Sequence, residues 1–166
     1  MVTAQELGQG FERIYGRMEG LRFFFAPGRV NLIGEHIDYS GGHVFPCAVD
    51  FGTFLALGAR EDGKLRGFSE NFPGPGILEV DLEDTSFRED RGWFNYVAGV
   101  LDTLKAMGYP PGPGLDLYIR GEIPPGAGLS SSASLEMAAA FAFNQVWGLG
   151  LDRPALAEVC HRAENE

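Results

Sequence analysis

Glycine and serine residues gather in one short stretch, PPGAGLSSSASLE, at residues 124–136. Gly126 and Gly128 let the backbone turn so that successive N–H groups face one concavity, and a helix beginning just after the turn adds the positive end of its dipole. The three serine hydroxyls at residues 130–132 can contact phosphate oxygens or Mg²⁺. The stretch therefore predicts a loop that binds phosphate groups.

Two well-known phosphate loops do not fit this stretch. The Walker A loop ends in Gly-Lys followed by Ser or Thr, and the stretch contains no lysine. The dinucleotide-binding fingerprint needs a third glycine at the position where Ser131 stands. On composition alone a structural alternative stays open, namely a glycine-rich turn with serine caps on a buried helix.

A second group of reactive side chains lies in the stretch GRVNLIGEHIDYSGG, at residues 28–42. Glu35 and Asp38 can accept hydrogen bonds from sugar hydroxyls, and His36 can donate or accept one. Arg29 is a fixed cation that can hold a phosphoryl group through two parallel hydrogen bonds. Each residue taken singly also has a structural explanation: a cap, a buried histidine or a surface ion pair. A metal site is the weaker functional option, because no third histidine or cysteine lies nearby.

These two stretches together resemble a known enzyme family. Residues 28–42 resemble the signature of galactokinases, and residues 124–136 resemble the ATP-phosphate motif of the wider GHMP kinases, which include homoserine, mevalonate and phosphomevalonate kinases. The segments WFNYV at residues 93–97 and CHRAE at residues 160–164 are also similar to family segments. The resemblance extends over residues 25–166, nearly the whole chain.

The resemblance implies ATP-dependent transfer of the γ-phosphoryl group to the anomeric hydroxyl of galactose, which gives galactose 1-phosphate. Arg29 would stabilise the transferring phosphoryl group. The implied sugar-binding residues are Glu35, His36, Ile37 and Asp38. Ile37 replaces the usual threonine, an exchange also seen in relatives that act on N-acetylgalactosamine, whereas residues 41–49 are more typical of true galactokinases.

The resemblance also implies an ATP site with Mg²⁺. Near the adenosine it suggests Ser69, Trp93 and Tyr96, and around the phosphates it suggests Gly126, Ala127, Gly128, Leu129, Ser130, Ser131 and Ser132. Ser132 and Glu164 would bind the Mg²⁺ ion. The aspartate that serves as catalytic base in the family is expected beyond Glu166, so the fragment alone is expected to be inactive and to need the remaining C-terminal part of the same protein.

Two alternatives to a galactokinase stay open. One is a GHMP kinase that acts on N-acetylgalactosamine or another small molecule. The other is a non-catalytic sensor that binds galactose and ATP, because a sensor need not keep the catalytic aspartate.

The composition limits the function classes. Thirteen basic and 23 acidic residues give a formal net charge of −10 with no clustered basic stripe, which argues against a nucleic-acid partner. We expect no membrane span and no signal peptide, since no apolar run reaches the length of a spanning helix. Cys47 and Cys160 belong to no metal or disulfide spacing and are expected to be buried free thiols of a cytoplasmic protein.

The elements that position these residues follow from periodicity and turn residues. Helices and strands alternate without a strict βαβα order, which favours an α+β fold. The resemblance implies that residues 1–166 form the N-terminal domain of the GHMP kinase fold (ribosomal protein S5 domain 2-like), with a mixed sheet. We predict helices over 3–19, 93–107, 131–147 and from 152 onward, and strands over 21–25, 43–60 with a break near 50–52, 64–69, 77–82 and 115–119. Asp62-Gly63 predicts a hairpin that pairs the second and third of these strands.

Overall fold

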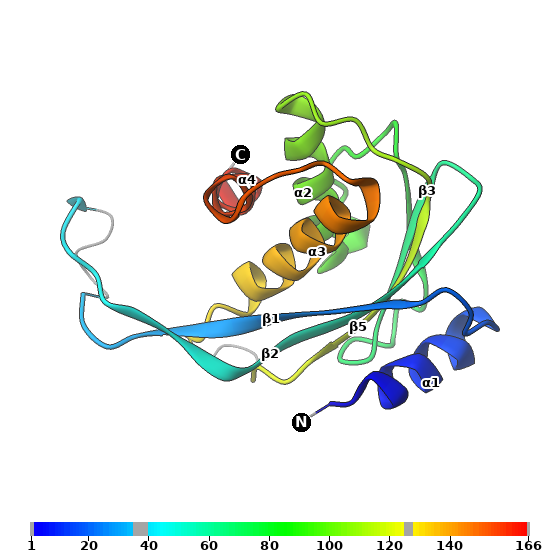
Figure 1. Ribbon diagram of the computed structural model, residues 1–166, viewed down its shortest axis with the longest axis horizontal. Coiled ribbons are helices and arrows are strands. Elements are labelled where there is room, and N and C mark those ends of the chain that lie inside the picture. The colour runs from blue at the N-terminus through cyan, green and yellow to red at the C-terminus, as the bar shows by residue number, and fades with distance from the viewer. Residues whose placement is uncertain (1, 35–39, 125–127, 166) are drawn as a thin grey trace.

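The fold is a five-stranded mixed sheet with helices on both faces (Figure 1). The computed structural model describes residues 2–34, 40–124 and 128–165. The strands are β1 (Arg22–Asn31), β2 (Pro46–Ala59), β3 (Lys64–Ser69), β4 (Leu78–Asp81) and β5 (Leu115–Gly121). The helices are α1 (Ala4–Tyr15), α2 (Phe94–Ala106), α3 (Ser131–Trp147) and α4 (Arg153–Asn165). The predicted α+β class is confirmed.

The strand order in the sheet is β1-β2-β5-β3-β4. The β3–β5 pair is parallel, and the other three pairs are antiparallel. Parallel pairing needs a long crossover connection, and here β4 and α2 lie between β3 and β5 in the sequence. The central strand is therefore the last strand to appear along the described chain.

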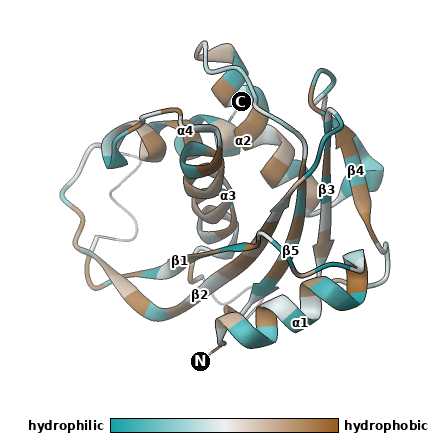
Figure 2. Cartoon of the chain, turned by 45° about the vertical axis from the view of Figure 1, so that its right-hand side comes forward, coloured by the Kyte–Doolittle hydropathy of each residue, from teal (hydrophilic) through white to brown (hydrophobic). Residues whose placement is uncertain are grey.

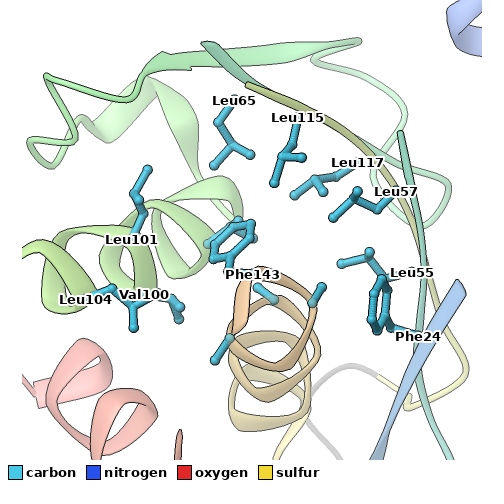
Figure 3. Close-up of a cluster of buried hydrophobic side chains, with 14 of the residues drawn as sticks. Phe24, Leu55, Leu57, Leu65, Val100, Leu101, Leu104, Leu115, Leu117 and Phe143 are labelled. Atoms are coloured by element: carbon cyan, nitrogen blue, oxygen red, sulfur yellow. The ribbon is translucent and has the colours of Figure 1, made fainter. Parts of the chain in front are cut away.

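The main core lies between the sheet and the layer formed by α2, α3 and α4 (Figure 3). Apolar side chains of the strands point into this layer and meet Leu101 and Leu104 of α2 and Phe143 of α3. The strand residues labelled in Figure 3 are Phe24, Leu55, Leu57, Leu65, Leu115 and Leu117. Burial of this apolar surface holds α3 rigidly across the sheet.

Helix α1 covers the opposite face of the sheet (Figure 2). Leu7 and Phe11 pack on Phe54, Ala56 and Tyr118, and the polar face of the helix points to solvent. The helix begins at a capping box in which the Glu6 N–H donates to the Thr3 hydroxyl (3.2 Å) and the Thr3 N–H donates to the Glu6 carboxylate (2.8 Å).

The predicted end of the first strand is wrong, because β1 continues through Pro27 to Asn31. β2 is one strand from Pro46 to Ala59, but its pairing with β1 is irregular close to the break predicted near 50–52, since Pro27 pairs with Gly52 and Arg29 pairs with Ala48. Pro27 is tolerated because β1 is an edge strand with only one hydrogen-bonded side, and a shift of register between Pro27 and Arg29 absorbs the local irregularity. Gly52 is needed there, because a Cβ atom would lie 2.0 Å from the Ala26 carbonyl oxygen.

The hairpin predicted at Asp62-Gly63 does not pair its two strands. Strand β5 lies between β2 and β3 and hydrogen-bonds to both. The turn bonds to the start of β5 instead, since the Gly114 N–H donates to the Asp62 carbonyl and the Arg60 N–H donates to the Gly114 carbonyl, both at 2.8 Å. The prediction of a change of direction at Asp62-Gly63 is right, but β5 lies between the two strands that this segment connects.

A network of ion pairs fixes the end of the sheet where β5 begins. The carboxylate of Asp116 is 1% exposed and receives hydrogen bonds from Arg66 (2.7 Å), Arg17 (2.9 Å) and Arg60 (3.1 Å). Burial acts to raise the pKa of this carboxyl, but the hydrogen bonds from Arg66 and Arg17 outweigh burial and hold it below its ordinary value. Asp116 therefore ties β2, β3 and the turn after α1 together.

The cysteine prediction is half right. Both thiols are free and Cys160 is buried in α4, but Cys47 is exposed on β2. Cys47 lies near the start of β2, where it pairs with Val30 near the end of β1. Among the helices of the described ranges, none combines the length and apolar character that crossing a membrane requires.

Candidate functional site

The glycine–serine loop is fastened to the first strand. The backbone N–H of Arg29, on β1, donates a 3.2 Å hydrogen bond to the carbonyl of Leu129. The neighbouring Gly28 makes this approach possible, because a Cβ atom there would lie 3.1 Å from the same carbonyl oxygen and 3.0 Å from Ile123. The two stretches identified in the sequence therefore meet at one place, and the exposed Arg29 side chain starts beside the loop.

A buried serine joins α3 to the same strands one turn further on. Ser134 Oγ donates to the Ala26 carbonyl (2.9 Å) and accepts from the Thr53 N–H (3.1 Å). Thr53 Oγ1 lies 2.9 Å from the same hydroxyl, and both side chains are buried. These bonds satisfy backbone groups next to the irregularity in the β1–β2 pairing and fix the start of α3 on the sheet.

The first turn of α3 is open to an anion. Ser130, the N-cap residue, adopts a left-handed backbone (φ 58°, ψ 52°), and its side chain makes no cap hydrogen bond. A left-handed conformation is uncommon for a residue other than glycine and often marks a functional turn. N–H groups that lack a side-chain cap at a helix N-terminus form an anion-binding site.

A pocket of about 280 Å³ opens directly in front of this turn. Its aromatic walls are Phe72, Trp93 and Tyr96, and Ser131 and Ser132 lie at its edge. The other residues that line it are Thr53, Ser69, Asn71, Ile119, Gly121, Ile123 and Leu135. Aromatic walls beside a phosphate-binding turn fit a ligand that has a flat ring and an anionic tail.

Two side-chain hydrogen bonds shape the rim of this pocket. The amide of Asn71 donates to the Gly121 carbonyl (2.9 Å) and accepts from the Gly121 N–H (2.7 Å). This reciprocal pair closes the chain after β3 onto the end of β5. Trp93 Nε1 is buried and finds no acceptor among the residues that the structure describes.

The hydroxyl of Ser132 donates a 2.7 Å hydrogen bond to the carboxylate of Glu164 on α4. Hydroxyl and carboxylate oxygens are the ligands that Mg²⁺ prefers, and Mg²⁺ takes its remaining ligands from water and phosphate. The donor set of this pair therefore fits Mg²⁺. In the described ranges, no group of three or more His, Cys, Asp or Glu side chains gathers as a metal site.

A second carboxylate lies deeper between α3 and α4. Glu136 is fully buried, and neither of its carboxylate oxygens has a hydrogen-bond partner within the described part of the chain. Burial, with the negative charge of Glu164 as a smaller cause, raises the pKa of Glu136 from 4.5 to about 7. Burial raises the pKa of the Cys160 thiol to about 12, with contributions from Glu136 and Glu164.

The structure brings together many of the residues suggested by the sequence. Ser69, Trp93, Tyr96, Ser131 and Ser132 line the pocket described above, and Glu164 bonds to Ser132. Gly128, Leu129 and Ser130 form the turn in front of it, and Arg29 bonds to Leu129. Glu35, His36, Ile37, Asp38, Gly126 and Ala127 lie outside the described residues.

Several residues of the site were missed by sequence reasoning. Thr53, Asn71 and Phe72 come from segments whose meeting depends on strand pairing, which local patterns do not reveal. Ser134 and Glu136 carried a signal that was available, because they are polar residues inside a helix that is apolar on every side. A polar residue in such a helix must be buried and so must have a structural or chemical role.

The sequence matches two known protein families. Residues 9–59 match the galactokinase galactose-binding signature, and residues 95–166 match the N-terminal domain of GHMP kinases. A galactokinase of Bacillus subtilis is 46% identical over 161 residues, which are 97% of this chain and 41% of that protein. A galactokinase of Clostridium tetani is 48% identical over 99% of this chain and 41% of its own length.

Solved structures agree with the sequence comparisons. The crystal structure of Lactococcus lactis galactokinase complexed with galactose matches 97% of this chain with a TM-score of 0.93 and 41% identity, and 42% of that chain is covered. Methanococcus jannaschii mevalonate kinase, at 20% identity and a TM-score of 0.76 over 89% of this chain and 47% of its own, shares the fold. The chain thus spans about two fifths of the length of the galactokinases that it matches.

Proposed function

We propose that this chain is the N-terminal part of a galactokinase of the GHMP kinase family and that the whole protein phosphorylates galactose with ATP. The proposal rests on the contact between the stretch that contains Arg29 and the glycine–serine loop that contains Leu129. The strand that carries Arg29 is hydrogen-bonded to the loop that ends at the open N-terminus of α3. Residues 1–166 form the N-terminal domain, which contributes the sugar-binding stretch and the ATP-phosphate loop.

The pocket binds the nucleotide. The adenosine lies against Trp93 and Tyr96 near Ser69, and residues 126–132 bind the phosphates. Support comes from the aromatic walls of the pocket and from the helix N-terminus beside them. No lysine lies in this loop, so backbone N–H groups and serine hydroxyls are the donors that this part of the chain offers to the phosphates.

Ser132 and Glu164 hold Mg²⁺ on the phosphates. When bound, the ion neutralises negative charge on the phosphate oxygens. The chain contributes one hydroxyl and one carboxylate oxygen from α3 and α4. Because these helices pack together, the position of a bound ion would be fixed. The Ser132 hydroxyl uses its proton in the hydrogen bond to Glu164, so the lone pairs of its oxygen would stay available to a metal ion.

The sugar lies next to Arg29. Glu35, His36 and Asp38 accept or donate hydrogen bonds at the sugar hydroxyls, and Ile37 contacts the sugar between them. The exposed guanidinium of Arg29 stabilises the transferring phosphoryl group, because its planar fork matches two phosphate oxygens. The hydroxyl proton goes to a carboxylate base, which the family resemblance expects beyond residue 166.

The direct test is phosphorylation of a panel of sugars by the full-length protein. We expect ADP release with galactose and little with N-acetylgalactosamine. Turnover with N-acetylgalactosamine and none with galactose would assign the protein to that related activity. Binding of both ATP and galactose without turnover would identify a sensor.

Asp38→Ala in the full-length protein separates the two binding functions. Loss of the acceptor for a sugar hydroxyl is expected to weaken use of galactose far more than use of ATP. Steady-state kinetics with each substrate varied in turn measure this difference. A larger effect on ATP than on galactose would remove Asp38 from the sugar site.

A further inference from the structure

Glu136 is a buried charge without a local explanation. Its side chain is 0% exposed, and both carboxylate oxygens lack a hydrogen-bond partner among the residues described. An ionised carboxylate in such surroundings destabilises a protein unless an opposite charge or hydrogen-bond donors compensate. The charged group identified as acting on it is negative, namely Glu164. A glutamine or an apolar side chain of the same size would make a more stable helix contact.

The position of Glu136 relates it to the Ser132–Glu164 pair. Glu136 follows Ser132 by four residues on α3, which places both on one face of that helix, about 6 Å apart along its axis. Cys160 precedes Glu164 by four residues on α4 in the same way. Ser132 and Glu164 are hydrogen-bonded across the α3–α4 contact, and the thiol of Cys160 is influenced by both carboxylates, so Glu136 and Cys160 lie near this pair on the same two helices.

The Ser132–Glu164 pair carries only one negative charge, whereas a divalent cation carries two positive charges. Ser132 offers a neutral hydroxyl, and Glu164 offers one carboxylate. A second carboxylate one helical turn along α3 would strengthen the attraction for a divalent cation at Ser132 without touching it, because the charge of the buried Glu136 is screened less by water than that of an exposed group. A cation there would in turn supply the positive charge that Glu136 lacks.

We propose that Glu136 is the second negative charge of the cation site at Ser132 and Glu164, a positioning residue that strengthens cation binding from inside the α3–α4 contact. This inference rests on the proposed function, which brings a divalent cation to the phosphate loop. It explains why a carboxylate is kept where it lowers stability. The same carboxylate that weakens the fold strengthens the site, so the two effects of removing it have opposite signs.

The test measures Mn²⁺ binding to the full-length protein by electron paramagnetic resonance, in the presence of a non-hydrolysable ATP analogue at about pH 8, above the pKa of Glu136. Glu136→Gln keeps the shape of the side chain and removes the charge. We expect about 10- to 100-fold weaker Mn²⁺ binding, which is the range found when partners of metal ligands are changed. In the absence of cation and nucleotide, Tm is expected to rise by a few degrees.

Two further variants make the result decisive. Glu136→Met tests the same loss of charge with an apolar side chain suited to a helix contact. Asn144→Ala is the matched control, because Asn144 is another buried polar residue of α3, bonded to the backbone of Leu151 far from Ser132. It should lower Tm and leave Mn²⁺ affinity within about twofold, because its effect is on stability alone.

Each outcome decides between the two proposals. Unchanged Mn²⁺ affinity in both Glu136 variants would exclude Glu136 from the cation site and leave the proposed kinase function standing. A fall of Tm together with affinity, matched by Asn144→Ala, would show that Glu136 is structural. Failure of the unmodified protein to bind Mn²⁺ with the nucleotide would overturn both the inference and the proposed cation site.

Discussion

Two buried carboxylates in this molecule have opposite surroundings. Asp116, at the start of β5, receives hydrogen bonds from three arginines, whereas Glu136, inside α3, has no hydrogen-bond partner in the described residues. Both side chains are almost completely buried. The pKa of Asp116 lies below its ordinary value, and that of Glu136 is raised to about 7. Burial alone therefore does not determine whether the pKa of a carboxyl group is raised or lowered.

The two carboxylates lie near opposite ends of the sheet, and these two ends have different roles. Asp116 lies at the end where α1, β2 and β3 must be held together, and its arginines come from these neighbouring segments. Glu136 lies in α3 one helical turn after Ser132, which lines the pocket near the end of β5. A fully compensated charge is typical of a structural role, and an uncompensated one is typical of a site that awaits a ligand.

The largest effect is expected from Asp116→Ala. The change leaves three arginines near one another without their shared carboxylate, and breaking a buried ion pair on one side costs about 3 kcal/mol or more. Urea denaturation of the full-length protein measures the loss. Asp62→Ala is the control, since it removes an exposed carboxylate that pairs with Arg60 and should have a far smaller effect. Equal effects of both changes would remove Asp116 from its central role.

The pH dependence of stability should differ between the two carboxylates. The folded state raises the pKa of Glu136 from 4.5 to about 7, so it binds more protons than the unfolded state between these values. The contribution of the protonated group is fully present below about pH 4.5 and is lost as the pH rises through about 7. Glu136→Gln should remove a decline on the order of 3 kcal/mol over this range.

Asp116 should act in the opposite direction. Its folded-state pKa is lowered, so its contribution is present above its ordinary value of 3.8 and is lost as the pH falls below it. Denaturation curves measured across pH for the unmodified protein, Glu136→Gln and Asp116→Asn separate the two. A Glu136→Gln protein that keeps the decline between pH 4.5 and about 7 would show that another group causes it.

Ser134→Ala tests a buried polar group that has hydrogen-bond partners and also lies beside the pocket. The change leaves the Thr53 N–H and the Ala26 carbonyl without their partner, which costs about 2 kcal/mol. Because the start of α3 then loses its tie to the sheet, KM for ATP should rise as well. Ser131→Ala is the control for stability, since Ser131 is exposed at the helix start. A stable Ser134→Ala protein would mean that water replaces the hydroxyl.

The smallest effect is expected from Lys64→Met. Lys64 pairs with Glu79 across β3 and β4, and both side chains are nearly half exposed. Water and salt screen such a pair, so the midpoint of urea denaturation should not change measurably. A large shift would show that exposed pairs matter in this sheet and would weaken the contrast drawn from the two buried carboxylates.

The sequence was informative where local rules decide the structure. The apolar run and its flanking glycines predicted α3 with the bounds that the structure has, and Asp152 caps α4 as expected, accepting a hydrogen bond from the Ala155 N–H. Residue type and spacing also identified Ser131 and Ser132 at the pocket, and the resemblance added Ser69, Trp93 and Tyr96, while the other lining residues were not predicted. The resemblance to galactokinases then supplied the family and the α+β fold, which the comparisons bear out.

The errors arose where distant segments decide the structure. Nothing near Asp62 indicates that β5 separates β2 from β3, because that pairing depends on a strand some fifty residues later. Pro27 reads as a strand end in isolation, but on an edge strand its missing N–H has no partner to lose. The three arginines of Asp116 likewise come from segments whose proximity only the completed sheet creates.

The central place of β5 has a consequence for how the chain folds as it is synthesised. Strands β2 and β3 leave the ribosome early, but each has an unpaired side until residues 115–121 arrive between them. Such late, non-local pairing slows folding and leaves strand edges exposed to other chains in the meantime. Nascent chains that end before β5 should therefore be cleaved readily by protease, and protection of β2 and β3 should appear together once residue 121 has emerged.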